Sequence, residues 1–213
     1  MEIKRTANAG VLLTLDGVRV LLDGVSREIL PYLPTPDEVR KELLQAPADV
    51  LCFTHQHADH YDAAFVSEYL QIAAGPILGP ADIPFCRQET LQLGNVRITQ
   101  ISSRHIGKQE PMGHVSFILE GSKCIWFMGD ASPMQWRGRT DLPKPDILVA
   151  PYAYATGTGW QISQSLGADE IVLLHLPARS KDIYSLWDAV ETTVGQEGMR
   201  RLLIPEMGQN LVI

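Results

Sequence analysis

Cysteine is scarce in this sequence, and its spacing excludes the common cysteine-based sites. Cys52, Cys86 and Cys124 make an odd number and contain no CxxC pair, so neither a disulfide framework nor a cysteine zinc knuckle is expected. Cys52 and Cys124 lie inside apolar runs, where a thiol behaves as a small apolar side chain of low reactivity. We therefore expect inert core thiols and no cysteine nucleophile.

Positive charge is also in short supply. The 213 residues carry 18 Lys and Arg against 25 Asp and Glu, which gives a formal net charge of -7. Basic residues cluster only in the short pairs Arg137/Arg139 and Arg200-Arg201, whereas binding to a nucleic-acid backbone depends on extended clusters of Lys and Arg. We therefore expect a small-molecule substrate and no nucleic-acid partner, and the sequence gives no indication of the oligomeric state.

Long apolar segments are absent as well. Residues 147–168 are uncharged and long enough to cross a bilayer, but Pro151, Gly157 and many hydroxyl side chains argue against a membrane helix. Asp16 and Asp23 interrupt the apolar residues near the start, which leaves no core for a signal peptide. We therefore expect a soluble, cytoplasmic protein that does not bind membranes.

The overall composition is that of an ordinary globular chain. Hydrophobic residues make up 45% and charged residues 20%, and no Ser/Gly-rich or Pro-rich linker divides the sequence. A chain of this length can bury a large core. We predict a single domain over residues 1–213.

Turn and capping signals divide the first part of the chain into strands and helices. Asp16-Gly17 separates two β-rich runs and predicts a type I′ hairpin. Thr35 is expected to cap a helix in which Pro36 takes the first position and Glu38 completes a capping box. Asp62 is expected to cap a second helix. The predicted strands cover residues 11–15, 18–22, 50–53, 96–102, 115–120 and 123–128.

Strands and helices alternate in the second part of the chain. Strands are predicted at residues 147–150 and 171–174, and helices at residues 160–166 and 183–194. Antiparallel hairpins followed by alternating strands and helices favour an α/β architecture, with sheet packed on sheet and helices outside.

Three histidines and an aspartate follow an apolar strand. The segment Thr54-His55-Gln56-His57-Ala58-Asp59-His60 holds three of the six histidines of the chain. Side chains two residues apart on an extended segment point the same way, so His55 and His57 can bind the same ion. Asp59 and His60, beyond the bend, then face a neighbouring position. A lone histidine is commonly a hydrogen-bonded core or surface residue, but this cluster favours two adjacent metal sites.

Such a cluster suits hydrolytic chemistry. A bound divalent ion lowers the pKa of water from 15.7 toward about 7, which makes hydroxide available at neutral pH. The remaining histidines, His105, His114 and His175, lie near the ends of other predicted strands, where they are candidates to complete the site.

The segment HQHADH resembles the HxHxDH motif of the metallo-β-lactamase superfamily. Further matches follow the order of that family. Asp23 resembles the acidic residue that ends an early strand, and Arg104-His105 resembles the third histidine motif. Gly129-Asp130 is similar to the pair that supplies a bridging carboxylate, and His175 to the final histidine. The resemblance covers roughly residues 11–179 and implies a four-layer αββα sandwich with metal ions at one edge.

The resemblance also implies a dinuclear site with a set of ligands. The implied ligands are His55, His57 and His105 for one ion, Asp59, His60 and His175 for the other, and Asp130 as the bridge between them. Zinc is the expected ion by default, and manganese or iron are alternatives because this set contains no thiolate to enforce a preference for soft metals.

Two histidines compete for the third position of the first metal site. His105 follows the strand predicted at residues 96–102, where loops reach the metal edge, whereas His114 opens the next strand. In relatives that carry two histidines here, the earlier one is the ligand. The resemblance therefore favours His105 and leaves His114 as a residue that lines the pocket or supports the ligands.

The leading functional hypothesis is a metal-dependent hydrolase. Hydroxide held between two ions would attack a small ester, lactone, thioester or phosphodiester, and Asp59 would orient it as well as bind metal. The alternatives are a mononuclear iron dioxygenase acting on a persulfide and a non-catalytic, metal-bound sensor or binding module. Among subfamilies, the compact length and the Leu174-His175-Leu176 ending resemble the ascorbate-phosphate lactonase group. His57 stands where the oxygen-reducing diiron flavoproteins carry glutamate, which argues against that subfamily.

Side chains near the implied ligands are candidates for substrate contact. Tyr152 and Trp160 follow the strand predicted at residues 147–150 and are expected to wall the pocket. Arg104 and Arg179 flank implied ligands and are expected to receive a phosphate or carboxylate.

Overall fold

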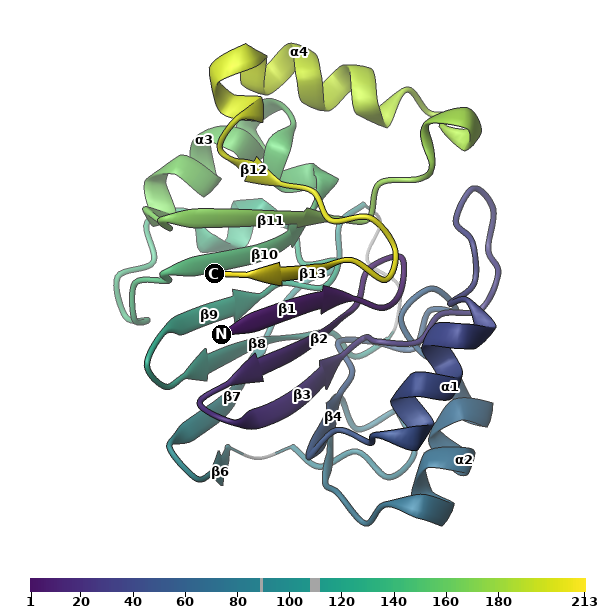
Figure 1. Cartoon of the computed structure of the whole chain (residues 1–213). Coiled ribbons are helices and arrows are strands. Elements are labelled where there is room, and N and C mark those ends of the chain that lie inside the picture. Colours follow the sequence, from purple (N-terminus) through teal and green to yellow (C-terminus); the bar gives the residue numbers. More distant parts are fainter. Residues whose placement is uncertain (89, 108–111) are drawn as a thin grey trace.

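The protein folds as two β-sheets packed between two pairs of helices. The structure is a computed structural model that describes residues 1–88, 90–107 and 112–213. The helices are α1 (Asp37–Gln45), α2 (Ala63–Ile72), α3 (Gly157–Leu166) and α4 (Leu186–Met199). Figure 1 shows α1 and α2 gathered at one side of the molecule and α3 and α4 at another. No helix among the described residues is long and apolar enough to span a membrane.

The first sheet begins antiparallel and ends parallel. Over the described residues it has six strands, which in spatial order are β13 (Asn210–Val212), β1 (Glu2–Arg5), β2 (Val11–Leu15), β3 (Val18–Leu22), β4 (Val50–Cys52) and β5 (Ile77–Leu78). Strands β3, β4 and β5 are parallel. The segments that follow β3 and β4 therefore leave the sheet at the same edge.

The second sheet has the same mixed character. Its seven strands within the described ranges are β12 (Leu202–Leu203), β11 (Glu170–Leu174), β10 (Ile147–Pro151), β9 (Cys124–Phe127), β8 (Val115–Glu120), β7 (Val96–Ser102) and β6 (Leu91–Leu93). Strands β9, β10 and β11 are parallel. The segments after these three strands also share one edge.

Three apolar clusters hold the layers together. Leu13 and Phe127 belong to the central cluster, to which both sheets contribute. Leu12, on the opposite face of its strand, packs with residues of α1 and α2, and Leu148 packs with residues of α3 and α4. This alternation follows from the two-residue period of a strand. The layers confirm the predicted αββα sandwich.

Two local predictions are confirmed at the β2–β3 hairpin and at the start of α2. Asp16 and Gly17 both have positive φ, 50° and 83°, as a type I′ turn requires. The Asp62 carboxylate accepts the N–H of Ala64 at 2.9 Å and that of Phe65 at 3.4 Å. Asp62 therefore caps α2.

The predicted cap of α1 is wrong. The helix begins at Asp37 and has no side-chain cap. Thr35 Oγ1 instead accepts the backbone N–H of Ser26 at 2.9 Å, and this bond closes the loop between β3 and α1.

The bounds of α4 differ from the prediction at both ends. The helix begins at Leu186 rather than Ile183, because the Asp182 carboxylate accepts the N–H of Leu186 at 2.9 Å and stabilises the later start. At Gly195 the backbone leaves helical geometry (φ 65°, ψ 179°), yet the helix resumes and reaches Met199. Glycine adopts positive φ without strain, so the chain bends here.

Candidate metal centre

Polar side chains gather where strands of both sheets end. Asp23 follows β3 and residues 54–60 follow β4, while Asp130 and His175 follow β9 and β11 of the second sheet. His105 lies in the connection between β7 and β8. Because the parallel strands of each sheet end at one edge, residues far apart in the sequence meet there.

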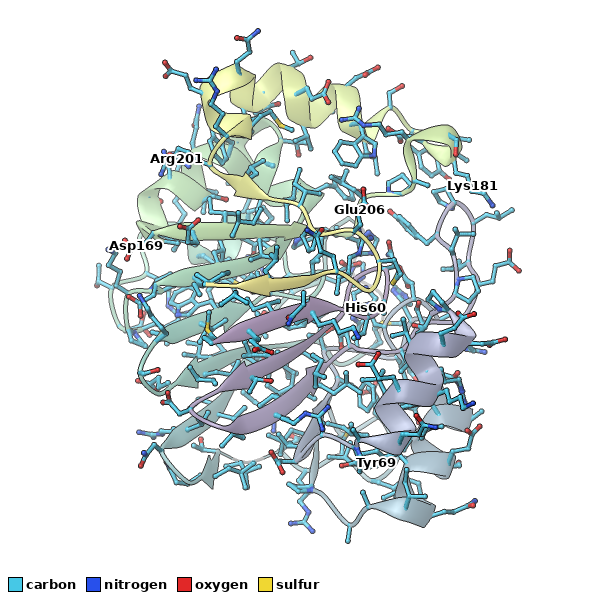
Figure 2. All side chains as sticks on the ribbon, in the orientation of Figure 1. His60, Tyr69, Asp169, Lys181, Arg201 and Glu206 are labelled. Carbon is cyan, nitrogen blue, oxygen red and sulfur yellow. The ribbon has the colours of Figure 1, made fainter. Side chains whose placement is uncertain are left out.

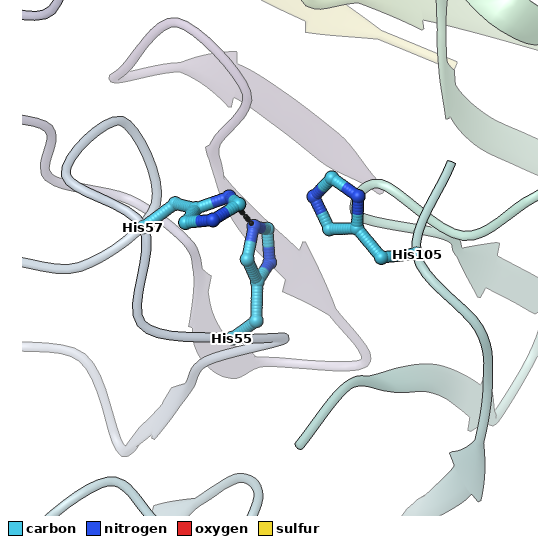
Figure 3. A group of neighbouring side chains, drawn as sticks. All are labelled: His55, His57 and His105. Atoms are coloured by element: carbon cyan, nitrogen blue, oxygen red, sulfur yellow. Dashed lines mark hydrogen bonds between the residues drawn. The ribbon is translucent and has the colours of Figure 1, made fainter. Parts of the chain in front are cut away.

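His55, His57 and His105 form the first group of possible ligands (Figure 3). One ligand atom of each side chain lies within 4.8 Å of the others. His55 Nε2 is 2.9 Å from His57 Nδ1, and the ring centres of His57 and His105 are 4.9 Å apart. The backbone N–H of His60 donates to the carbonyl oxygen of His57 at 2.9 Å. That bond turns the chain after His57, so the following residues face another position.

Asp59, His60 and His175 form the second group. Their ligand atoms also lie within 4.8 Å of one another. Asp59 Oδ2 is 3.0 Å from His175 Nε2 and 3.8 Å from His60 Nε2. All three side chains are buried, and Figure 2 shows His60 enclosed within the molecule. One short segment thus supplies residues to both groups.

Asp130 lies between the two groups. Its Oδ2 is 3.4 Å from His105 Nε2 in the first group. The same oxygen is 3.5 Å from His60 Nε2 and 3.4 Å from His175 Nε2 in the second group. A carboxylate in this position can serve ions held by both groups.

Several polar atoms of this centre lack hydrogen-bond partners. Within the described part of the chain, they include His60 Nε2, His105 Nε2 and Asp130 Oδ1, all of them buried. An unpaired buried polar group costs about 1–3 kcal/mol, so a protein rarely keeps several together without a use. Imidazole nitrogens and carboxylate oxygens are ligands for zinc, manganese and iron. The donor set therefore fits divalent metal ions.

The Asp23 carboxylate orients histidines of both groups. Asp23 Oδ2 accepts hydrogen bonds from His60 Nδ1 at 2.8 Å and from Thr54 Oγ1 at 2.6 Å. Thr54 Oγ1 in turn accepts from His55 Nδ1 at 3.0 Å. Because His55 and His60 each give a proton at Nδ1 to this network, each Nε2 carries the lone pair that a metal requires. Gly129 permits the close packing, since a Cβ there would lie 2.5 Å from the Thr54 side chain.

Burial and mutual contacts set the protonation of the centre. Burial, together with the neighbouring His60, lowers the pKa of His55 well below its ordinary value, which keeps the ring neutral. Burial alone raises the pKa of a carboxyl group, but His175 and His60 hold the pKa of Asp59 at about 2. The same two histidines hold the pKa of Asp130 well below its usual range. Burial alone lowers the pKa of a histidine, but Asp130 and Asp23 raise the pKa of His60. Binding of an ion there displaces a proton, because the neutral imidazole is the form that binds metal.

The loop that carries His105 is fastened to the segment that carries Asp130. His105 forms an isolated β-bridge with Ala131, and the N–H of Ile106 donates to the Asp130 carbonyl oxygen at 2.8 Å. His105 Nδ1 donates to the Ile106 carbonyl oxygen at 2.6 Å. The Nε2 of His105 is therefore left to face the Asp130 carboxylate.

His114 lies beside the first group of ligands. Its ring centre is 4.9 Å from that of His55 and 5.6 Å from that of His105. His114 Nδ1 is hydrogen-bonded to Ser103 Oγ at 2.7 Å, and burial lowers the pKa of His114 to about 3. None of the three candidate ligand groups found among the described residues includes it. This placement suits a neutral residue that supports or borders the first group.

The two aromatic residues predicted to wall the pocket lie in different places. The Tyr152 ring is 6.0 Å from the His175 ring, which puts it at the edge of the second group. Trp160 instead belongs to the apolar cluster of α3 and α4, where its ring reaches within 3.2 Å of the position of a Cβ on Gly198. The expectation that Trp160 walls the pocket is corrected, because its position on α3 directs it toward α4.

The two arginines predicted to meet the substrate are exposed. The backbone N–H of Arg104 donates to Gln135 Oε1 at 2.9 Å, a contact that helps to hold the His105 loop. Arg179 Nη2 donates to Glu191 Oε1 at 2.6 Å, and its guanidinium lies 4.0 Å from the centre of the Trp187 ring. Arg179 is therefore already ion-paired and stacked.

Tyr32 borders the centre although no sequence pattern pointed to it. Its ring meets the His175 ring edge-on, with centres 4.5 Å apart. Burial, followed by the neighbouring Tyr152, raises the pKa of Tyr32, so its hydroxyl stays protonated at neutral pH. Tyr32 lies in the long connection between β3 and α1, where neither periodicity nor a motif marks individual residues.

A comparison with known families agrees with this geometry. The family model described as the β-lactamase superfamily domain matches residues 2–175, a range that contains all seven residues of the two groups and the bridge. The chain belongs to the β-lactamase superfamily. Among curated proteins, none matches the chain.

Solved structures share the complete metallo-β-lactamase fold with this superfamily member. A possible metal-dependent hydrolase from Veillonella parvula has a TM-score of 0.73 at 16% identity, covering 100% of this chain and 99% of the other. An isothiocyanate hydrolase from Delia radicum gut bacteria has a TM-score of 0.72 at 18% identity, with coverage of 100% and 99%. The metallo-β-lactamase fold protein YhfI from Bacillus subtilis has a TM-score of 0.65 at 18% identity, with coverage of 99% and 98%. Similarity at these identities shows the fold.

Proposed function

We propose that this superfamily member is a metal-dependent hydrolase with a dinuclear site. The proposed ligands are His55, His57 and His105 for one ion, Asp59, His60 and His175 for the other, and Asp130 as the bridge. Zinc is the default ion, and manganese and iron are alternatives because this set contains no thiolate to enforce a preference for soft metals.

The observation that carries the proposal is the convergence of unpaired nitrogens on one carboxylate. His105 Nε2 and His60 Nε2, from the two groups, lie 3.4 Å and 3.5 Å from Asp130 Oδ2, and neither of these buried nitrogens has a hydrogen-bond partner. Histidines kept only for structure would have these atoms paired. His57 and His105 are only half-buried, so a substrate can approach the first group from solvent.

The residues of the centre divide the chemical work. When bound, divalent ions make hydroxide available from water at neutral pH and polarise the bond that is cleaved. Asp59 is ionised, with a pKa of about 2, so its carboxylate can accept a hydrogen bond from the attacking group and orient it. Asp23 keeps His60 and, through Thr54, His55 in the required tautomers.

Small molecules with an electrophilic carbon or phosphorus centre suit this arrangement. Esters, lactones, thioesters and phosphodiesters are the candidate classes. Isothiocyanates join them, because one solved structure with this fold is an isothiocyanate hydrolase and their central carbon is also open to attack by hydroxide.

A substrate screen on metal-reconstituted protein tests the proposal. The purified protein would be stripped with a chelator, reconstituted with zinc, manganese or iron, and assayed on one representative of each class. We expect metal-dependent hydrolysis of at least one class, lost in Asp59→Asn. Iron-dependent oxygen uptake with a persulfide in place of hydrolysis would contradict the proposal and favour a dioxygenase. Tight metal binding without turnover of any class would favour a sensor or binding module.

A further inference from the structure

A cavity of about 460 Å³ lies beside the metal centre. Its walls include Tyr32, Leu33, Leu176, Trp187, Ile204 and Met207. Pockets for small ligands commonly enclose about 300–1,000 Å³, so the cavity can accept a small organic group.

The cavity shares a wall with the second group of metal ligands. Leu176 directly follows His175, and the Tyr32 ring packs edge-on against the His175 ring at 4.5 Å. Asn8 also lines the cavity, and its carbonyl oxygen accepts the N–H of His175 at 3.2 Å. Leu176, Tyr32 and Asn8 therefore place the cavity next to the second group of ligands.

The lining of the cavity is mainly apolar. Apart from Arg5, Asn8, Arg179 and Glu206, the lining residues are apolar or aromatic. Trp187 and Tyr32 supply two aromatic surfaces, and Trp187 is held in place because its Nε1 donates to the Pro177 carbonyl oxygen at 2.8 Å.

The two cations of the lining already have partners. Arg5 donates to four backbone carbonyl oxygens, those of Ala7, Asn8, Leu176 and Pro205, at 3.0–3.4 Å. Arg179 is paired with Glu191 at 2.6 Å. Glu206 (Figure 2) adds a negative charge to the lining. An anionic ligand would thus meet a carboxylate and two occupied guanidinium groups, whereas an uncharged apolar group would meet favourable surface.

We infer that the cavity binds the non-reacting part of the substrate and selects an uncharged apolar or aromatic group. The inference rests on the proposed hydrolase function. It narrows the substrate to esters, thioesters, lactones or isothiocyanates that carry such a group, and it disfavours phosphodiesters and other anionic molecules.

Binding of a matched pair of fluorescent probes tests the inference without requiring catalysis. N-phenyl-1-naphthylamine is uncharged, and 1-anilinonaphthalene-8-sulfonate is its anionic counterpart. We expect the neutral probe to bind the purified protein at least about tenfold more tightly than the sulfonate, because each buried apolar group contributes, whereas the sulfonate meets the Glu206 carboxylate and two guanidinium groups that already have partners. Equal or tighter binding of the sulfonate would overturn the inference.

Two substitutions in one loop test whether the neutral probe binds in the cavity. Leu33 and Ile29 are both 43% exposed, but only Leu33 lines the cavity. We expect Leu33→Asp to weaken binding of the neutral probe about tenfold, because it introduces a charge into the apolar wall, and Ile29→Asp to leave binding within about twofold. Circular dichroism and thermal melting confirm that both variants fold. Equal effects of the two substitutions would show that the probe binds elsewhere.

A chain-length series separates this inference from the proposed function. In the class that the enzyme hydrolyses, the reacting bond is kept and the acyl or alkyl chain is lengthened from two to eight carbons. We expect kcat/KM to rise about fourfold per methylene until the cavity is filled, and a terminal carboxylate to abolish the gain. Hydrolysis with a flat chain-length profile would overturn the inference while leaving the hydrolase proposal intact. Absence of hydrolysis in every class would overturn the hydrolase proposal instead.

Discussion

The metal centre and the neighbouring cavity are built from different kinds of segment. Most of the proposed ligands come directly after strands, such as His55 after β4 and His175 after β11. The cavity is lined largely by loops, including residues 32–33 between β3 and α1 and residues 205–207 between β12 and β13. Strand ends hold catalytic groups rigidly, whereas loops can vary without disturbing the sheets. In the proposed enzyme, the chemistry and the choice of substrate would therefore reside in separate parts of the fold.

The two regions also differ in how their polar groups are used. The centre keeps buried atoms such as His60 Nε2 and Asp130 Oδ1 without hydrogen-bond partners. In the cavity, Arg5 and Arg179 are already engaged. The unpaired buried donors and acceptors of the centre are suited to binding ions. In the cavity the charged groups already have partners, so the apolar surface determines which ligands bind.

Among changes that distinguish the metal centre from the cavity, Asp59→Asn is expected to have the largest effect on activity. The amide keeps the shape but removes the negative charge proposed to hold the second ion, and it replaces one carboxylate oxygen, a possible acceptor for the attacking group, with an N–H donor. We expect activity to fall by about 100-fold or more, with little change in the melting temperature of the metal-free protein. Near-normal turnover by a variant that folds would show that Asp59 has another role.

Replacing His105 and His114 separately tests which of them is the ligand. His105→Ala removes a nitrogen 3.4 Å from Asp130 Oδ2, so we expect loss of one bound ion and of nearly all activity. His114→Ala removes a neighbour that is hydrogen-bonded to Ser103, so both ions should remain and mainly substrate handling should change. Metal content of the two variants decides the matter, and the reverse pattern would exchange the two assignments.

Asp23→Asn probes the support of the centre rather than its ligands. Asn tolerates the positive φ of 46° at this position, but its amide nitrogen cannot accept the protons of Thr54 Oγ1 and His60 Nδ1. We expect metal affinity to fall by about 10–100-fold, while binding of the neutral probe in the cavity is unchanged. Affinity equal to that of the unmodified protein would mean that Asp23 does not orient the ligands.

Much of the fold and of the centre is visible in the sequence, for a physical reason. The β2–β3 hairpin depends on Asp16-Gly17, and the start of α2 depends on Asp62, so each is encoded by adjacent residues. His55, His57, Asp59 and His60 lie within one short segment, and strand ends bring Asp130 to them. Features that depend on adjacent residues in this way can be predicted from the sequence.

Other features depend on contacts that no local pattern encodes. Strands such as β13 and β1 form by pairing with each other across the length of the chain. Thr35 resembles a helix cap but bonds to Ser26, and Tyr32 reaches His175 only because its loop folds back on the centre. The cavity cannot be predicted from the sequence for the same reason, since its walls come from loops that meet only in the folded protein.

The smallest effect on activity is expected from labelling the cysteines, because they belong to neither region. Burial raises the pKa of Cys86 to about 12 and that of Cys124 to about 11. Because the thiolate is the reactive form, labelling by iodoacetamide at pH 8 should be about 200-fold slower for Cys124 and about 2,000-fold slower for Cys86 than for a free thiol, and it should accelerate as the pH rises. Mass spectrometry after labelling measures this, with unfolded protein as the control. Rapid labelling of the native protein together with loss of activity would contradict the assignment of inert thiols.

The central claim is that seven side chains hold two divalent ions, and metal binding tests it most directly. The chelator-treated protein would be dialysed against micromolar zinc or manganese, and the bound metal measured by elemental mass spectrometry together with the protein concentration. The account predicts two ions per chain in the unmodified protein and fewer in His105→Ala. A folded protein that binds neither zinc nor manganese at micromolar concentration would contradict the claim.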